Sequence, residues 1–120
     1  MWAVVGASPD RSRPSFGVLR FLRRQGYRVI PVNPLVAEVD GLPCYPDLAS
    51  IPAHEGVEVV DVFRRSEHVA GIVEEAIAIG AKAVWCQLGV IDFTAHQRAL
   101  AAGLDVVMDV CPAIEHPRLV

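Results

Sequence analysis

Long apolar runs are missing from this sequence of 120 residues, although 52% of the residues are hydrophobic. No stretch approaches the roughly 18 unbroken apolar residues of a membrane helix, so we expect no association with a membrane. A mean hydropathy of +0.36 and a charged fraction of 21% also exclude a disordered segment. The apolar surplus sits in short Val/Ile-rich runs, which are typical of parallel strands covered on both faces.

Cysteines and targeting segments are also few. Three cysteines at irregular spacing (Cys44, Cys86, Cys111) fit a reducing compartment better than a disulfide framework. No basic region precedes the apolar run at Met1, so the pattern predicts no signal peptide. These features together predict a cytoplasmic protein.

The net charge of −3 gives no indication of nucleic-acid binding. Its distribution is uneven, because the first 29 residues carry six arginines and one acid, Asp10. The arginines are Arg11, Arg13, Arg20, Arg23, Arg24 and Arg28. A segment with a net charge of +5 can attract an anionic ligand. For Arg20, Arg23 and Arg24 we favour the simpler interpretation that they form the solvated face of a helix.

Strand-like and helix-like segments alternate along the chain. The expected strands cover residues 1–6, 27–32, 57–63, 82–86 and 104–110. The expected helices run from Pro14 to a stop at Gly26, from a Ser66 cap to Gly80, and from an Asp92 cap to Gly103. Residues 35–52, with three prolines in or at the end of the segment, are expected to be irregular.

This alternation predicts a single α/β domain over residues 1–120, with right-handed crossovers and a parallel sheet. We predict a Rossmann-like three-layer sandwich whose five strands, numbered in chain order, are arranged 3-2-1-4-5. Ligands of such sheets lie beyond the carboxyl ends of the strands, where the order reverses. The expected site therefore follows from the topology.

The loop after the first strand joins Gly6 to a helix that begins near Pro14. Free N–H groups and a positive dipole end at such a helix suit a phosphate. Its polar residues are Ser8, Ser12 and Ser15, which offer hydroxyl donors, and Arg11 and Arg13, which offer charge-assisted hydrogen bonds. We predict phosphate binding here, against the alternative that the serines only cap and the arginines are solvated.

Two well-known nucleotide motifs are absent. The glycine after Gly6 is Gly17, so the loop is not G-x-G-x-x-G, and the only lysine, Lys82, rules out a P-loop. The second strand ends in Asn33-Pro34, where an NAD site usually places an acid for the ribose. Both departures weigh against a nicotinamide dinucleotide and leave room for another nucleotide-like ligand.

Catalytic groups are scarce. The four histidines show no metal-ligand spacing and the cysteines form no C-x-x-C pair. The cluster of Cys111 with Glu115 and His116 can be drawn as a nucleophile with a base, but we favour a small apolar cysteine at the end of a buried strand. Asp61 and Asp109 are expected to form local hydrogen bonds. We therefore predict no catalytic residues and no metal.

Several segments, in order along the chain, resemble the small stand-alone CoA-binding domain proteins. These are relatives of the CoA-binding domain in the succinyl-CoA synthetase alpha subunit and in ADP-forming acyl-CoA synthetases. The segments are Val4–Ser8, Arg13–Ser15, Gly26–Pro34, Val60–Arg64, Ala78–Lys82, Trp85–Gly89 and Asp109–Cys111 with Glu115-His116. The family commonly has an arginine between the Asp and Cys of the last motif, where this chain has Val110.

The resemblance implies a Rossmann-like domain that binds CoA through its ADP portion. Carried onto this chain, it places phosphates at Gly6, Ala7, Ser8, Arg11, Ser12, Arg13, Pro14 and Ser15. It places adenosine beside Val32, Asn33, Pro34, Phe63, Arg64 and Arg65, and the pantetheine arm along Gln87, Leu88 and Gly89.

From the residues and the resemblance we expect a protein that binds CoA or an acyl-CoA and is not an enzyme by itself. It would carry, sense or present CoA, and its protein partner is not identified. One alternative is a small NAD(P)- or nucleotide-dependent enzyme that uses Asp109, Cys111 or His116. The other is a regulatory subunit with a vestigial pocket, whose surface binds another protein.

Overall fold

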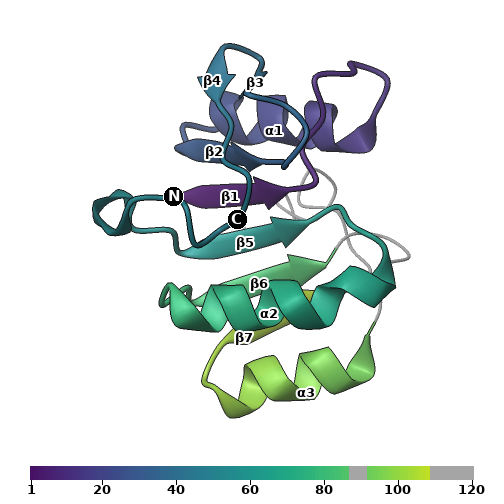
Figure 1. Cartoon of the computed structure of the whole chain (residues 1–120), viewed down its shortest axis with the longest axis vertical. Coiled ribbons are helices and arrows are strands. Elements are labelled where there is room, and N and C mark those ends of the chain that lie inside the picture. The colour runs from purple at the N-terminus through teal and green to yellow at the C-terminus, as the bar shows by residue number, and fades with distance from the viewer. Residues whose placement is uncertain (87–91, 109–120) are drawn as a thin grey trace.

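Five parallel strands form the central sheet of this protein (Figure 1). A computed structural model describes residues 1–86 and 92–108. The strands of the sheet are β1 (Trp2–Val5), β2 (Val29–Val32), β5 (Val59–Val62), β6 (Ala83–Cys86) and β7 (Asp105–Met108). The α-helices are α1 (Pro14–Arg24), α2 (Val69–Ala78) and α3 (Phe93–Ala101). No helix in the described ranges is long and apolar enough to span a membrane.

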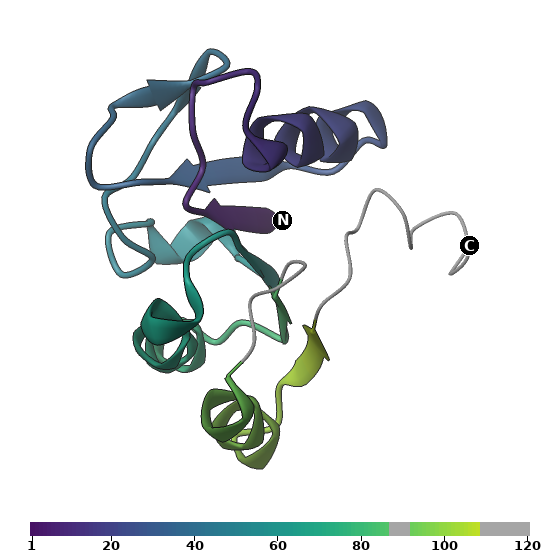
Figure 2. The same cartoon turned by 90° about the vertical axis from the view of Figure 1, so that its right-hand side faces the viewer.

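The helices cover the sheet from both sides, with α1 on one face and α2 with α3 on the other (Figure 2). In α1, Phe16, Leu19 and Leu22 repeat with the period of a helix and pack on Trp2 and Val4. On the opposite face, α2 buries Val69, Ile72, Val73 and Ala76 against the sheet. The predicted α/β three-layer sandwich is confirmed.

The predicted strand order is wrong in one respect. The sheet runs β2-β1-β5-β6-β7, which is 2-1-3-4-5 in chain order, whereas we expected 3-2-1-4-5. The third strand, β5, pairs with the free edge of β1, with Val62 opposite Val5. The order therefore reverses between β1 and β5, so the ligand crevice of such a sheet is expected between the ends of these two strands.

The outer edge of β2 explains this order. Pro31 has no N–H to donate, and prolines in sheets are confined to edges. Tyr45 occupies this edge, because its N–H donates to the Pro31 carbonyl (3.1 Å) while the Asn33 N–H donates to the Tyr45 carbonyl (2.9 Å). β2 is therefore the last strand at this end of the sheet, and its outer edge is covered by the segment around Tyr45.

The segment between β2 and β5 is more regular than expected. It contains a small antiparallel hairpin of β3 (Glu38–Val39) and β4 (Leu42–Pro43), followed by the 3₁₀ helix η1 (Ala53–Glu55). Asp40 and Gly41, with φ of 49° and 79°, form its turn, and Asp-Gly is a strong hairpin signal that the expectation missed. The Asp40 carboxylate lies 3.0 Å from Arg23 and 3.9 Å from Arg20, so these exposed arginines of α1 are paired.

Two expected helix caps have different outcomes. Asp92 accepts a hydrogen bond from the Ala95 N–H (3.0 Å) and caps α3, as predicted. The expected cap at Ser66 is wrong, because Ser66–His68 form the 3₁₀ turn η2 and α2 begins only at Val69. This shift places His68 at the start of α2, beside the carboxyl end of the sheet.

Candidate nucleotide-binding site

Gly6 lies where the ends of β1 and β5 meet. Its backbone has φ +87°, and a Cβ atom here would stand 2.7 Å from the Phe63 carbonyl oxygen and 3.1 Å from Cδ of Arg64. Real Cβ atoms do not approach a backbone oxygen this closely, so only glycine fits. The predicted site residues Gly6, Phe63 and Arg64 are thus brought into direct contact by the observed strand order.

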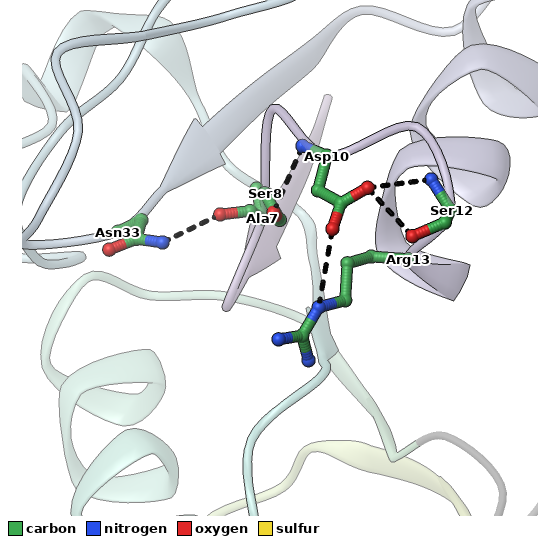
Figure 3. Close-up of polar contacts among 6 residues, drawn as sticks. All are labelled: Ala7, Ser8, Asp10, Ser12, Arg13 and Asn33. Atoms are coloured by element: carbon green, nitrogen blue, oxygen red, sulfur yellow. Dashed lines mark hydrogen bonds and ion pairs between the residues drawn. The ribbon is translucent and has the colours of Figure 1, made fainter.

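Asn33 fastens the end of β2 to the loop that follows β1 (Figure 3). Its Nδ2 donates to the Ala7 carbonyl at 2.8 Å, and its Oδ1 accepts from the Leu35 N–H at 2.8 Å. The N–H groups of Gly6 and Ala7 both donate to the Val32 carbonyl, at 2.9 and 3.3 Å. The two strand ends therefore form one rigid unit, in which the Asn33 amide is committed to the fold.

Asp10 organises the loop between β1 and α1 (Figure 3). Its Oδ1 accepts from the Ser12 N–H (2.9 Å) and hydroxyl (2.7 Å), its N–H donates to Ser8 Oγ (3.1 Å), and its Oδ2 lies 3.9 Å from Nε of Arg13. The hydrogen bonds from Ser12, with a smaller contribution from Arg13, hold the pKa of this carboxyl below its ordinary value. Two groups predicted to hold phosphate, Ser12 and Arg13, thus contact Asp10 instead in this structure.

Other donors of this loop stay open. Within the loop, all of which the structure describes, the N–H groups of Ser8, Arg11 and Ser15 have no hydrogen-bond acceptor. Ser15 is buried in the first turn of α1 behind Pro14, and the Arg11 guanidinium lies 5.8 Å from the centre of the Phe16 ring. The phosphate role of the loop stays a prediction, and these N–H groups are the ones available for it.

A cavity of about 280 Å³ opens beside Gly6, beneath the start of α2. Its apolar walls are Val5, Val32, Pro34, Pro46, Leu48 and Ile72, and glycines 6 and 71 leave it open. A Cβ on Gly71 would meet nothing within 4 Å, so the space in front of this glycine is empty. Of the predicted site residues, Gly6, Val32, Pro34 and Arg64 line this cavity.

The cavity has a basic end, formed by Arg64 and His68, and Glu75 lies away from this end along α2. His68 stands at the start of α2 and Glu75 seven residues later, which is about 10.5 Å along a helix. Arg64 lies with His68, since Nη2 of the arginine is 3.4 Å from Nε2 of the histidine. Glu75 and Asp47 supply carboxylates, and Asp47 accepts from the Ser50 N–H and hydroxyl. The arrangement suits a ligand with an anionic end near Gly6 and hydrogen-bond donors farther along α2.

Comparison with known proteins decides the family. Residues 1–117 match the model of a family described as the CoA binding domain. This chain belongs to that family. As a member of the CoA-binding domain family it is assigned coenzyme A binding in general terms, which confirms the resemblance noted in the sequence.

Relatives of this CoA-binding domain occur alone and inside larger enzymes. YneT of Bacillus subtilis, an uncharacterized protein, is 36% identical over 114 residues, which are 95% of this chain and 83% of that protein. A hypothetical protein of Pyrococcus horikoshii has a solved structure that is 42% identical with a TM-score of 0.94, covering 98% of this chain and 82% of the other. ADP-forming acetate–CoA ligase I of Archaeoglobus fulgidus is 36% identical over 73 residues, 61% of this chain and 10% of that enzyme.

Sequence reasoning missed most of the lining of the cavity in this CoA-binding domain. The lining residues that were not predicted as site residues are Val5, Pro46, Asp47, Leu48, His68, Gly71, Ile72 and Glu75. Gly71 carried a signal, because glycine inside a helix costs about 1 kcal/mol relative to alanine and usually has a reason. His68, Gly71 and Glu75 also share the spacing of one helix face.

The remaining predicted residues have other positions. Arg65 is exposed and lies 4.0 Å from the Glu67 carboxylate. Gln87, Leu88 and Gly89 lie outside the described residues, as does the Cys111 cluster. The two described cysteines are free thiols. Burial, with smaller contributions from the Asp61 and Asp92 carboxylates, raises the pKa of Cys86 to about 11. Burial also raises the pKa of Cys44. Neither thiol is an activated nucleophile.

Proposed function

We propose that this protein binds coenzyme A or an acyl-CoA through the ADP portion, at the carboxyl ends of β1, β2 and β5. It does so as a carrier, sensor or presenting module without catalysis of its own, in the cytoplasm. Membership of the CoA-binding domain family supports the ligand class. The observation that carries the mode of binding is the cavity beside Gly6, at the point where the strand order reverses.

The size and polarity of the cavity support a nucleoside rather than the whole ligand. At about 280 Å³ it is slightly below the roughly 300–1,000 Å³ of complete small-molecule sites, so it takes one part of a molecule as long as CoA. Its apolar walls, Val32, Pro34 and Ile72 among them, suit a flat base. The carboxylates of Asp47 and Glu75 suit the amino group of adenine, because ionised carboxylates only accept hydrogen bonds.

The loop before α1 supports the phosphate end of the same ligand. The open N–H groups of Ser8, Arg11 and Ser15 belong to the loop that leads from Gly6 into α1, which packs on the sheet face opposite to α2. A pyrophosphate at a helix N-terminus is favoured by such donors and by the helix dipole. A non-catalytic role is supported by the two described thiols, whose pKa values are raised rather than lowered.

Filling the cavity tests this proposal. Gly71→Leu places a side chain in the empty space in front of Gly71, while helix propensity favours leucine over glycine by nearly 1 kcal/mol. We expect calorimetric titration to show at least a tenfold loss of CoA affinity with an unchanged melting temperature or a higher one. Gly17→Leu is the matched control, since Gly17 is also helical and exposed with open space around it.

Three outcomes would contradict parts of the proposal. If Gly71→Leu and the wild type bind CoA with equal affinity, the cavity does not take part in binding. Release of free CoA thiol from an acyl-CoA during incubation with the protein would contradict the non-catalytic role. Wild-type protein that binds no nucleotide would favour a regulatory subunit with a vestigial pocket.

A further inference from the structure

Arg64 crosses the junction between the cavity and the phosphate loop. Its aliphatic part packs on Gly6, where only a glycine leaves room for Cδ and for the Phe63 carbonyl. Its guanidinium reaches His68, with 3.4 Å between Nη2 and Nε2, and both side chains line the cavity. The arginine is therefore held at a fixed place by the backbone of one strand end and the start of α2.

Arg64 differs from most arginines in the described part of the chain. Six others lie within 4.0 Å of a carboxylate: Arg13, Arg20, Arg23, Arg28, Arg65 and Arg98. Arg64, which is half-buried, has no carboxylate within that distance among the residues described. A partly desolvated cation without a counter-charge is costly, and a bound anion offsets that cost.

The neighbouring charges leave this end of the cavity suited to an anion. Glu67 lies 3.7 Å from the same His68 nitrogen that faces Arg64, and its side chain is 67% exposed, so water weakens its field. Of the cavity carboxylates, Glu75 lies seven residues beyond His68 on α2, and neither Glu75 nor Asp47 has an ion pair with Arg64 among the described residues. Arg64 and His68 together present a planar guanidinium fork and an imidazole nitrogen, which match the oxygens of a phosphate.

We propose that Arg64 and His68 form a clamp for a phosphate group of the nucleotide, at the junction between the base cavity and the loop after β1. This clamp rests on the proposed function and gives it a specificity-determining pair. Both the ribose phosphate and the pyrophosphate of CoA offer anionic oxygens to this clamp. Comparing the affinities of ligands that have or lack each group shows which of the two it binds.

Calorimetric titration of CoA, dephospho-CoA, ADP and adenosine into the wild type and three variants tests the clamp. We expect Arg64→Gln to weaken CoA binding about tenfold to a hundredfold, as loss of a charge-assisted hydrogen bond implies. His68→Gln should weaken it several-fold, and both variants should bind adenosine as the wild type does. If Arg64→Gln binds CoA and dephospho-CoA with equal affinity while the wild type prefers CoA, the clamp binds the ribose phosphate. If it weakens both ligands and ADP alike, it reads the pyrophosphate.

Arg24→Gln is the matched control, because Arg24 is exposed on α1 with no carboxylate contact among the described residues and its loss changes the net charge equally. This control should keep wild-type affinity. Arg64→Lys, which keeps the charge and loses the fork, should fall between wild type and Arg64→Gln. If Arg64→Gln binds CoA as tightly as the wild type does, the clamp is wrong while the proposed function stands. The same holds if Arg64→Gln loses as much affinity for adenosine as for CoA. Absence of CoA binding by the wild type would overturn the proposed function itself.

Discussion

Gly6 shows how one residue decides whether two strand ends can share a site. Its positive φ turns the chain out of β1, and its missing side chain lets the Phe63 carbonyl and Arg64 come against the backbone. Asn33 then locks this turn through the Ala7 carbonyl. The cavity and the phosphate loop consequently meet at a single point whose geometry depends on a hydrogen atom in place of a methyl group.

Gly6→Ala should therefore be far more destabilising than the same change at another glycine of positive φ. Gly26 is the matched control, because its φ is +89° and a Cβ atom added there would meet nothing within 4 Å. We expect Gly26→Ala to cost about 1–2 kcal/mol of unfolding free energy for the left-handed backbone alone. Gly6→Ala should cost roughly 1–3 kcal/mol more because of overpacking against Phe63. Urea unfolding measures both, and equal costs would contradict the close approach.

Individual residues were predictable to the extent that their position followed from one strand end. Gly6, Val32, Pro34 and Arg64 line the cavity because each follows or closes a strand that the sequence pattern already indicated. Pro46 and His68 reach the same cavity only through the fold of a connecting segment and the delayed start of α2. The local spacing of residues in the sequence does not specify how these segments fold back onto the cavity, so Pro46 and His68 were missed.

At the scale of elements, a single proline carried information that the pattern of strands did not. Hydrophobic periodicity identified every strand of the main sheet, but it is silent on which strands are neighbours. Pro31 indicated that β2 lies at an edge, which excludes the expected order in which β2 has strands on both sides. With β5 beside β1, the site moved to the ends of β1 and β5.

The start of α3 offers a test of one element in isolation. Asp92 caps this helix through Ala95, and a lost cap typically costs about 1 kcal/mol, within a range of roughly 0.5–2 kcal/mol. We expect Asp92→Ala to lower the free energy of unfolding by that amount in urea titration. Asp92→Asn retains an oxygen acceptor and should stay close to wild type. A full loss in the asparagine variant would show that the carboxylate acts by its charge instead.

At the scale of the whole molecule, the arginine-rich first third is less cationic than its sequence suggests. Four of its six arginines lie within 4.0 Å of a carboxylate: Arg13 at Asp10, Arg20 and Arg23 at Asp40, and Arg28 at Glu55. Exposed pairs of this kind contribute little stability, but they reduce the field that an anionic ligand meets. The attraction of a nucleotide therefore depends on a few positioned groups around Gly6 rather than on the net charge of the segment.

The positioned groups around Gly6 determine which nucleotide the whole molecule prefers to bind. A dinucleotide such as NAD usually relies on an acid at the end of the second strand, and here Asn33 has both ends of its amide bound to Ala7 and Leu35. We expect CoA to bind at least tenfold more tightly than NAD, a difference of about 1.4 kcal/mol.

At 100 times its dissociation constant CoA should add about 2.7 kcal/mol of stability, and NAD at the same concentration roughly half of that. A thermal-shift series with CoA, NAD and NADP measures this difference, and the Gly71→Leu variant, whose cavity is filled, should lose most of the CoA shift. A shift from NAD as large as that from CoA would contradict the role assigned to Asn33 and, with it, the preference for coenzyme A.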